Sequence, residues 1–247
     1  MRPSDSFLVN IGTRAQQDDV WGEHQVHQSS ILWQVSPSDQ LRSSVGTGFK
    51  APTLYQRYSA YGDESLQPEE SIGRDFGWVR VWGNGFHTEV TVFKNRFHQL
   101  IEFDGALSRY QNVGSFESHG VESQISWQFT SVSQFLGSYT YTKAVDPATD
   151  QQTARRPTDK FHMSYDHKWQ KARVRFDFVG KNRRRGGPFG ENADGYQTLR
   201  VAMEYSIREN LRAWGRVENL LDESYEEVAG YGTPRRSFYL GLSMAEI

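Results

Sequence analysis

The sequence of 247 residues contains no cysteine. Without cysteine the protein has neither a disulfide framework nor a metal site with thiolate ligands, and this composition is compatible with an oxidising compartment without requiring one. A strong charge imbalance is missing as well, because 28 basic and 30 acidic residues give a formal net charge of −2. The charge gives no general indication of nucleic-acid or anionic-membrane binding, so we expect no nucleic-acid partner.

Long hydrophobic runs are also absent. The sequence is 36% hydrophobic, with a mean hydropathy of −0.71. No run approaches the roughly 20 apolar residues that a membrane-spanning helix needs, which excludes a helical membrane protein. A transmembrane β-barrel passes this test, because its strands alternate apolar lipid-facing residues with polar lumen-facing ones.

Common catalytic motifs are missing too. We find no nucleophile elbow, phosphate-binding loop or pair of catalytic carboxylates. His24 and His27 are spaced loosely for a metal, and the acidic cluster within residues 222–227 is typical of a solvated surface. The protein is therefore interpreted as a non-enzyme, with neither a cofactor nor a bound metal.

The sequence does contain period-two alternation of apolar and polar residues. We expect about twelve strands of roughly ten residues, the length with which a tilted strand crosses a bilayer. The clearest is 121–129, where odd positions are mostly apolar and even positions polar. The expected strands lie within residues 6–14, 28–35, 41–49, 71–82, 86–104, 121–129, 135–141, 161–169, 172–178, 199–207, 211–217 and 238–244.

A soluble barrel, sandwich or interaction module would show the same alternation. Charged residues keep mostly to one parity, which favours a membrane barrel, because a cation facing lipid near mid-bilayer costs roughly 2–4 kcal/mol. The strand at 71–82 alternates less cleanly, because Arg74 and Arg80 share the parity of Phe76. Connection lengths point the same way, since short turns at one end and long loops at the other match the periplasmic and extracellular ends of such a barrel. Short turns are expected near Pro37, Asn84, Val132, Gln170 and Glu209, and mostly long loops around Trp21, Tyr58, Gly105, Ala148, Gly190 and Ala229.

Residues 46–69 read GTGFKAPTLYQRYSAYGDESLQPE, a strand followed by a long polar and aromatic loop and the start of another strand. Pro52 cannot donate a ladder hydrogen bond, so the first strand must stop there. This stretch resembles the middle of the barrel of TonB-dependent outer-membrane receptors, which import vitamin B12, iron siderophores or haem. The same resemblance is carried by NVGS and HGVE within residues 112–122, and by RVENLLD and GYGTP within 216–234.

The resemblance implies an all-β, antiparallel transmembrane β-barrel segment. Receptors of this kind have about 22 strands and a plugged lumen. Residues 1–247 are then expected to be one partial barrel domain, the C-terminal part of such a barrel, with the plug domain and signal peptide absent. The expected location is the outer membrane of a Gram-negative cell. The expected partners are outer-membrane lipid and lipopolysaccharide, and the TonB complex through the missing plug.

The resemblance also implies a ligand bound in the upper lumen by loop residues. Tyr55, Arg57, Tyr58 and Tyr61 lie in the first long loop and suit a flat, amphipathic ligand, because rigid aromatic faces stack while their hydroxyls form hydrogen bonds. An interfacial girdle or a purely structural loop is the alternative explanation.

Arg155, Arg156 and Tyr231 are similar in position to residues with which vitamin B12 receptors touch the corrinoid, although surface charge or girdle packing would also explain them. The favoured function is therefore TonB-dependent uptake of vitamin B12 (cobalamin). A ferric siderophore receptor is the alternative, because the basic residues within 181–185 would attract an anionic chelate. Residues 49–68 lack the histidine of haem importers, and a non-functional truncated barrel fragment is a further alternative.

Overall fold

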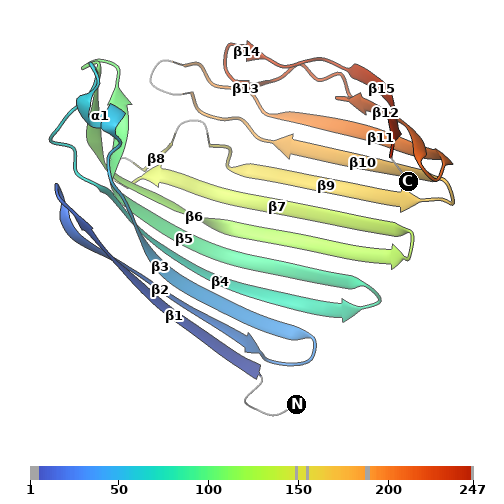
Figure 1. Cartoon of the computed structure of the whole chain (residues 1–247), viewed down its shortest axis with the longest axis horizontal. Coiled ribbons are helices and arrows are strands. Elements are labelled where there is room, and N and C mark those ends of the chain that lie inside the picture. The colour runs from blue at the N-terminus through green and yellow to red at the C-terminus, as the bar shows by residue number, and fades with distance from the viewer. Residues whose placement is uncertain (1–5, 148–149, 154–155, 187–189, 246–247) are drawn as a thin grey trace. The chain divides into compact units, whose positions relative to one another are not determined.

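The computed structural model describes residues 6–147, 150–153, 156–186 and 190–245. Its main element is an antiparallel sheet of 13 strands (Figure 1). In chain order these are β1 (Phe7–Asp18), β2 (Gly22–Gln34), β3 (Asp39–Lys50), β4 (Glu69–Gly83), β5 (Phe86–Asp104), β6 (Arg109–Thr130), β7 (Ser133–Asp146), β8 (Gln151–Gln152), β9 (Asp159–Lys168), β10 (Ala172–Lys181), β11 (Tyr196–Arg208), β12 (Leu211–Glu218) and β15 (Ser237–Met244). β13 (Glu226–Val228) and β14 (Tyr231–Gly232) form a separate two-stranded sheet.

Strands that are consecutive in the chain are neighbours in the sheet. The order is β1 to β7, then β9 to β12, then β15, and the short β8 pairs with β7. This up-and-down order confirms the all-β antiparallel class and the expected number of long strands. No helix within the described ranges has the length and apolar character that crossing a bilayer requires.

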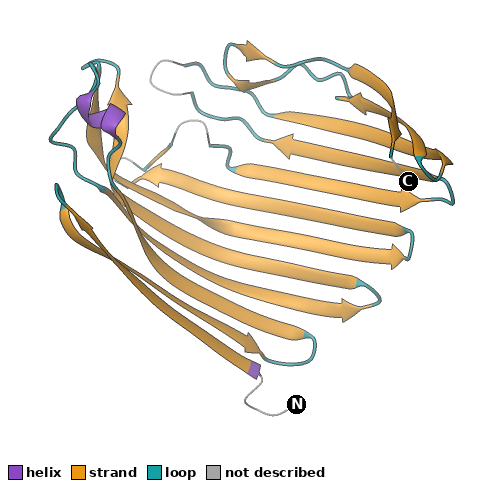
Figure 2. Ribbon diagram, viewed as in Figure 1, coloured by secondary structure: helices purple, strands orange, loops and turns teal. Residues whose placement is uncertain are grey.

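Three details differ from the expectations. The loop after β3 contains a helix, α1 (Leu54–Tyr58), where only irregular structure was expected (Figure 2). Thr53 caps it by accepting a hydrogen bond from the backbone N–H of Gln56, and the Gln56 side chain accepts one from the backbone of Thr53, which forms a capping box. The connections at residues 19–21 and 105–108 are short, not long, because β1, β2 and β6 continue beyond the predicted limits.

The chain forms two compact units, which are described separately. Unit 1 comprises residues 1–78, 91–121 and 142–153, and unit 2 comprises 79–90, 122–141 and 154–247. Unit 1 contains β1, β2, β3 and α1, and unit 2 contains β9 to β15. The strands β4 to β7 contribute to both.

One face of unit 2 is a continuous apolar surface. Across it, Tyr165 is paired with Phe176, Phe176 with Val201, Val201 with Val217 and Val217 with Phe238. Strand side chains alternate between faces, so each neighbour along a strand points to the opposite side. The register therefore places apolar residues of five strands on one side of the sheet, as the alternation predicts.

The other face of unit 2 carries charges that pair with one another. Asp177 is 8% exposed and accepts ion pairs from Arg175 at 2.9 Å and Arg200 at 2.8 Å. Arg173 pairs with Asp166 at 2.7 Å. Each of these arginines therefore has a carboxylate partner on the polar face, and two of them share the carboxylate of Asp177.

The two faces of β10 give a direct test of membrane placement. Replacing Phe176 on the apolar face with arginine is expected to lower the free energy of unfolding by about 2–4 kcal/mol, because a lipid-facing cation is desolvated. Val179→Arg is the matched control, because Val179 lies on the polar parity opposite His162 and Thr198. Unfolding of the complete receptor in lipid vesicles is followed by tryptophan fluorescence. Equal losses in the two variants would contradict the assignment of faces.

Candidate ligand-binding site

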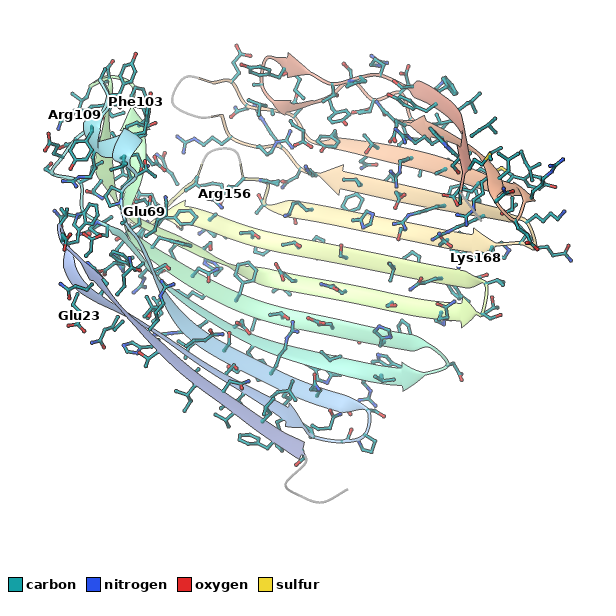
Figure 3. All side chains as sticks on the ribbon, in the orientation of Figure 1. Glu23, Glu69, Phe103, Arg109, Arg156 and Lys168 are labelled. Atoms are coloured by element: carbon teal, nitrogen blue, oxygen red, sulfur yellow. The ribbon has the colours of Figure 1, made fainter. Side chains whose placement is uncertain are left out.

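The loop that carries α1 is held against the hairpin formed by β5 and β6. The Arg109 guanidinium forms an ion pair with Asp63, and the Tyr110 N–H donates to the Tyr61 carbonyl at 2.8 Å. Figure 3 shows Arg109 and Phe103 beside α1. Both contacts join residues more than forty positions apart, and they fix the loop in place.

Asn112 on β6 completes this attachment. Its side-chain amide donates to the Gln67 carbonyl at 2.9 Å and to the Gln99 carbonyl at 2.7 Å, and its oxygen accepts from the Gln67 N–H at 2.7 Å. Gln99 has a φ of 56°, a left-handed conformation that is uncommon for a residue other than glycine. Leu66, next to Gln67, is only 2% exposed. One side chain thus satisfies two backbone groups of Gln67 in the irregular loop and one of Gln99 in β5.

The fixed loop and the β5–β6 hairpin together present four rings, which we call the aromatic surface: Tyr55, Tyr61, Phe103 and Tyr110. Ring centroids are 6.1 Å apart for Tyr55 and Tyr110, 5.8 Å for Tyr61 and Phe103, and 5.4 Å for Phe103 and Tyr110, all in edge-to-face arrangements. Tyr55, Tyr61 and Phe103 are 59%, 47% and 41% exposed. Exposed rings that already touch one another offer a preformed apolar platform with hydroxyl groups at its edge.

Arg57 and Tyr58, also predicted as ligand contacts, lie in a different arrangement. The Arg57 guanidinium carbon is 4.9 Å from the centre of the Trp21 ring and 4.8 Å from that of Tyr58. Arg57 also donates to the Glu64 carbonyl at 3.0 Å, and Trp21 Nε1 donates to the Leu66 carbonyl at 3.2 Å. Arg57 therefore ties the loop to the β1–β2 turn through cation–π contacts, while Tyr58 stays 55% exposed.

The other predicted contacts belong to unit 2. Tyr231 is 74% exposed and, with Arg184, Arg185 and Glu227, lines a cavity of about 180 Å³. Arg156 is exposed and lies just before the first residue of β9, whereas Lys168 is the last residue of that strand; Figure 3 shows the two at opposite ends. Arg155 lies outside the described residues.

The basic stretch beside Tyr231 is partly compensated by one carboxylate. Glu227 accepts from Lys181 at 2.7 Å, from Arg184 at 3.2 Å and from the Tyr196 hydroxyl. Burial opposes ionisation of Glu227, but the hydrogen bonds from Lys181 and Tyr196 outweigh it and hold the pKa of this carboxyl below its usual range. Glu227 belongs to the acidic cluster that was expected to be a solvated surface, and its side chain is 48% exposed. It also pairs with two of the cations that were expected to attract a ligand.

The sequence interpretation missed several residues that build these sites. Trp21, Phe103 and Tyr110 were not singled out, and only the position of Asn112 at the start of the NVGS motif signalled a special role. Phe103 and Tyr110 flank the short β5–β6 turn, which was expected to be a long loop. A correct strand length would have placed both rings at the same tip.

The fold and its faces define a class of protein. A meander of long antiparallel strands, with an apolar and a charged face separated by parity as in unit 2, is typical of the wall of an outer-membrane β-barrel. The chain belongs to the family described as TonB dependent receptor-like, beta-barrel, which matches residues 1–220. Members of this family are transport receptors of the outer membrane rather than enzymes.

Solved structures of similar fold include receptors for metal complexes. The siderophore receptor PirA from Acinetobacter baumannii superposes with a TM-score of 0.83 at 18% identity, covering 98% of this chain and 44% of that one. A mutant of the ferric enterobactin receptor PfeA from Pseudomonas aeruginosa gives 0.80 at 16%, covering 97% and 42%. The copper transporter OprC gives 0.79 at 14%, covering 97% and 46%. The chain thus spans less than half the length of these proteins, and the likeness concerns the fold alone.

The attachment of the α1 loop is expected to depend on pH through Asp63. Hydrogen bonds from the Ser65 hydroxyl and backbone N–H, with the Arg109 guanidinium, hold the pKa of Asp63 below its usual range. A carboxyl with a lowered folded-state pKa stabilises the fold above its unfolded pKa, and this contribution is lost as the pH falls through the folded pKa. Hydrogen-exchange protection of residues 59–67, corrected for intrinsic rates, should therefore fall on acidification.

Asp63→Asn is expected to remove most of that acid-dependent loss. Glu64→Gln is the matched control, because it removes the neighbouring carboxylate of the same loop. If the Asp63 variant lost protection with acid as the parent does, Asp63 would not be the responsible group.

Proposed function

We propose that this chain is the barrel part of an outer-membrane receptor that takes up a ferric siderophore by TonB-dependent transport. The observation that carries the proposal is the aromatic surface, which is exposed yet held rigidly at the loop end of unit 1. Family membership supports receptor-type transport in general. Coupling to TonB is part of the proposal and requires segments of the complete receptor other than these strands.

The chemistry of the aromatic surface suits a chelate with flat aromatic or amide groups. Each edge-to-face contact covers one face of one ring, and the remaining faces stay available for stacking. The hydroxyls of Tyr55 and Tyr61 can hydrogen-bond to the oxygen atoms around a bound metal. The names of PirA, PfeA and the ferric-catecholate import receptor Fiu, at a TM-score of 0.74, support iron chelates as the ligand class. In this proposal the chelated iron is cargo.

Cobalamin is the second candidate, and a specific observation favours it. The single carboxylate of Glu227 pairs with both Lys181 and Arg184, which reduces the positive charge available to a strongly anionic catecholate complex. Tyr231 remains exposed above the adjoining cavity and offers a ring and a hydroxyl to a less charged ligand. The predicted contacts Arg156 and Tyr231 belong to this alternative.

Direct binding to the complete receptor tests the siderophore proposal. Tyr61→Ala and Phe103→Ala should each raise the Kd of a ferric catecholate chelate roughly tenfold, because each removes a stacking face worth about 1.4 kcal/mol. Leu54→Ala is the matched control, because Leu54 is 77% exposed on α1 but belongs to no ring contact. Calorimetry gives the Kd. Unchanged affinity in both ring variants would exclude the aromatic surface as the binding site.

The cobalamin alternative is tested on the same preparation with cyanocobalamin. If cobalamin is the ligand, the parent should bind it tightly, and both Tyr231→Ala and Arg156→Ala should weaken binding, because they remove a stacking ring and a hydrogen-bond donor. Binding of the catecholate complex without binding of cyanocobalamin would eliminate this alternative. Binding of neither ligand by a folded receptor would contradict both.

A further inference from the structure

The outward parity of β5 changes from apolar to charged along the strand. Val92, Lys94, Arg96 and His98 are exposed, while the residues between them are buried or half-buried. Val92 is the last apolar residue of this exposed row. The change falls in the middle of a regular strand, so no turn or bend accounts for it.

The same change occurs on the partner strand. In β6 the outward parity runs from Val121 to His119 and Glu117, and the alternate residues Phe116 and Ser118 are each 7% exposed. Glu117 lies 2.5 Å from Lys94 and 2.9 Å from Arg96. Charged side chains of the two strands therefore meet on the exposed side, beyond the last apolar residue of each.

On β4 the outward residues also change from apolar to charged, and on β2 and β1 they change from apolar to polar. On β4, Phe76 is 49% exposed and the next outward residue is Arg74. On β2, Ile31 is 42% exposed and is followed toward the β1–β2 turn by His27. On β1, Ile11 is 82% exposed and the next residue of its parity is Thr13, which is paired with His27.

These positions are neighbours across the sheet. Ile31 is paired with Ser43 in β3, and Ser44 hydrogen-bonds to Asp75, next to Phe76. Asn95 lies against Gly73, next to Arg74, and hydrogen-bonds to Ser118 at 3.4 Å. From β4 to β6 the change of polarity is thus a continuous line, which we call the polarity line. The α1 loop and the β5–β6 turn lie on its charged side. On β3, by contrast, the apolar Val45 beyond Ser43 is still 39% exposed.

We propose that the polarity line marks the outer edge of the membrane hydrocarbon, and that Arg74, Lys94 and Arg96 beyond it bind the phosphate groups of a lipid A-type glycolipid in the outer leaflet. Long loops mark the extracellular end of an outer-membrane barrel, so the charged side of the line faces that leaflet. Outward cations are costly at mid-bilayer but nearly free at the interface, which explains why they begin where the apolar residues stop.

The local charges fit a phosphate partner. Lys94 and Arg96 share the single carboxylate of Glu117, and Arg74 has no acidic partner among the described residues. Arginine presents a planar set of donors that matches phosphate oxygens. The acidic Glu70 lies on the same strand as Arg74 but closer to the α1 loop. The three cations therefore leave an excess of positive charge at the headgroup level.

Site-specific labels test the position of the line. The chain has no cysteine, so a single introduced cysteine takes a nitroxide label at one place only. In the complete receptor reconstituted in lipid, labels at Phe76→Cys and Val92→Cys should be more accessible to oxygen, and a label at Arg96→Cys more accessible to a water-soluble nickel complex. Asn95→Cys, on the inward parity, is the control for lipid contact. Equal oxygen access at positions 92 and 96 would overturn the boundary.

A binding measurement tests the phosphate contact. The receptor in phospholipid nanodiscs is titrated with diphosphorylated lipid A and with its dephosphorylated form. The parent should prefer the phosphorylated lipid, and the triple variant Arg74→Gln, Lys94→Gln, Arg96→Gln should lose about tenfold in affinity for it or more. Lys50→Gln, which removes an exposed cation of the other parity of β3, is the matched control.

Equal affinity of the parent for the two lipids, or an unchanged affinity in the triple variant, would overturn the phosphate contact. Unaltered migration of the folded variants on unheated gels shows that they remain folded. Neither readout involves a metal chelate, so this proposal stands or falls independently of the ligand assigned above.

Discussion

A chain that crosses a bilayer must hydrogen-bond its backbone amides and carbonyls within the protein, because hydrocarbon offers no partners. Here each long strand pairs with the next one along the chain, so the ladder is built almost wholly from local connections. Pairing at a fixed register also decides which side chains share a face, since the period of a strand is two residues. A shift by one residue would turn Phe176 toward the polar side and Asp177 toward the apolar one. Backbone pairing and the separation of faces are thus one constraint.

The loops satisfy their backbone groups differently. The α1 loop lacks a ladder partner, and side chains replace it: the Asn112 amide on Gln67 and Gln99, and Arg109 on Asp63. These contacts allow the rings of the aromatic surface to remain exposed without collapsing onto the sheet. In unit 2 the carboxylate of Glu227 performs a comparable task by holding two cations beside the cavity near Tyr231. In both places rigidity is obtained by using up polar groups that would otherwise contact a ligand.

The likeness to PirA, PfeA and OprC shows what such a wall leaves undetermined. Proteins named for ferric enterobactin, siderophores and copper share it at 14–18% identity. Strand pairing tolerates this divergence because it depends on alternation rather than on particular residues. Ligand choice resides instead in loop side chains held by specific contacts, as Arg57 is held between Trp21 and Tyr58. A substrate can therefore be argued from these contacts but not from the barrel.

The sequence by itself determined the class of fold, the number and order of the long strands and the parity of their faces, because period-two alternation is a local signal and consecutive strands pair. It did not reveal α1, since a helix of five residues is too short to show a period. It predicted that β6 begins only at Val121, because the outward residues before that position are charged. In the structure this strand already begins at Arg109. Only the tertiary structure brought Tyr55 to Tyr110 and set Glu227 against Lys181, because such contacts join residues distant in the chain, and no local pattern encodes them.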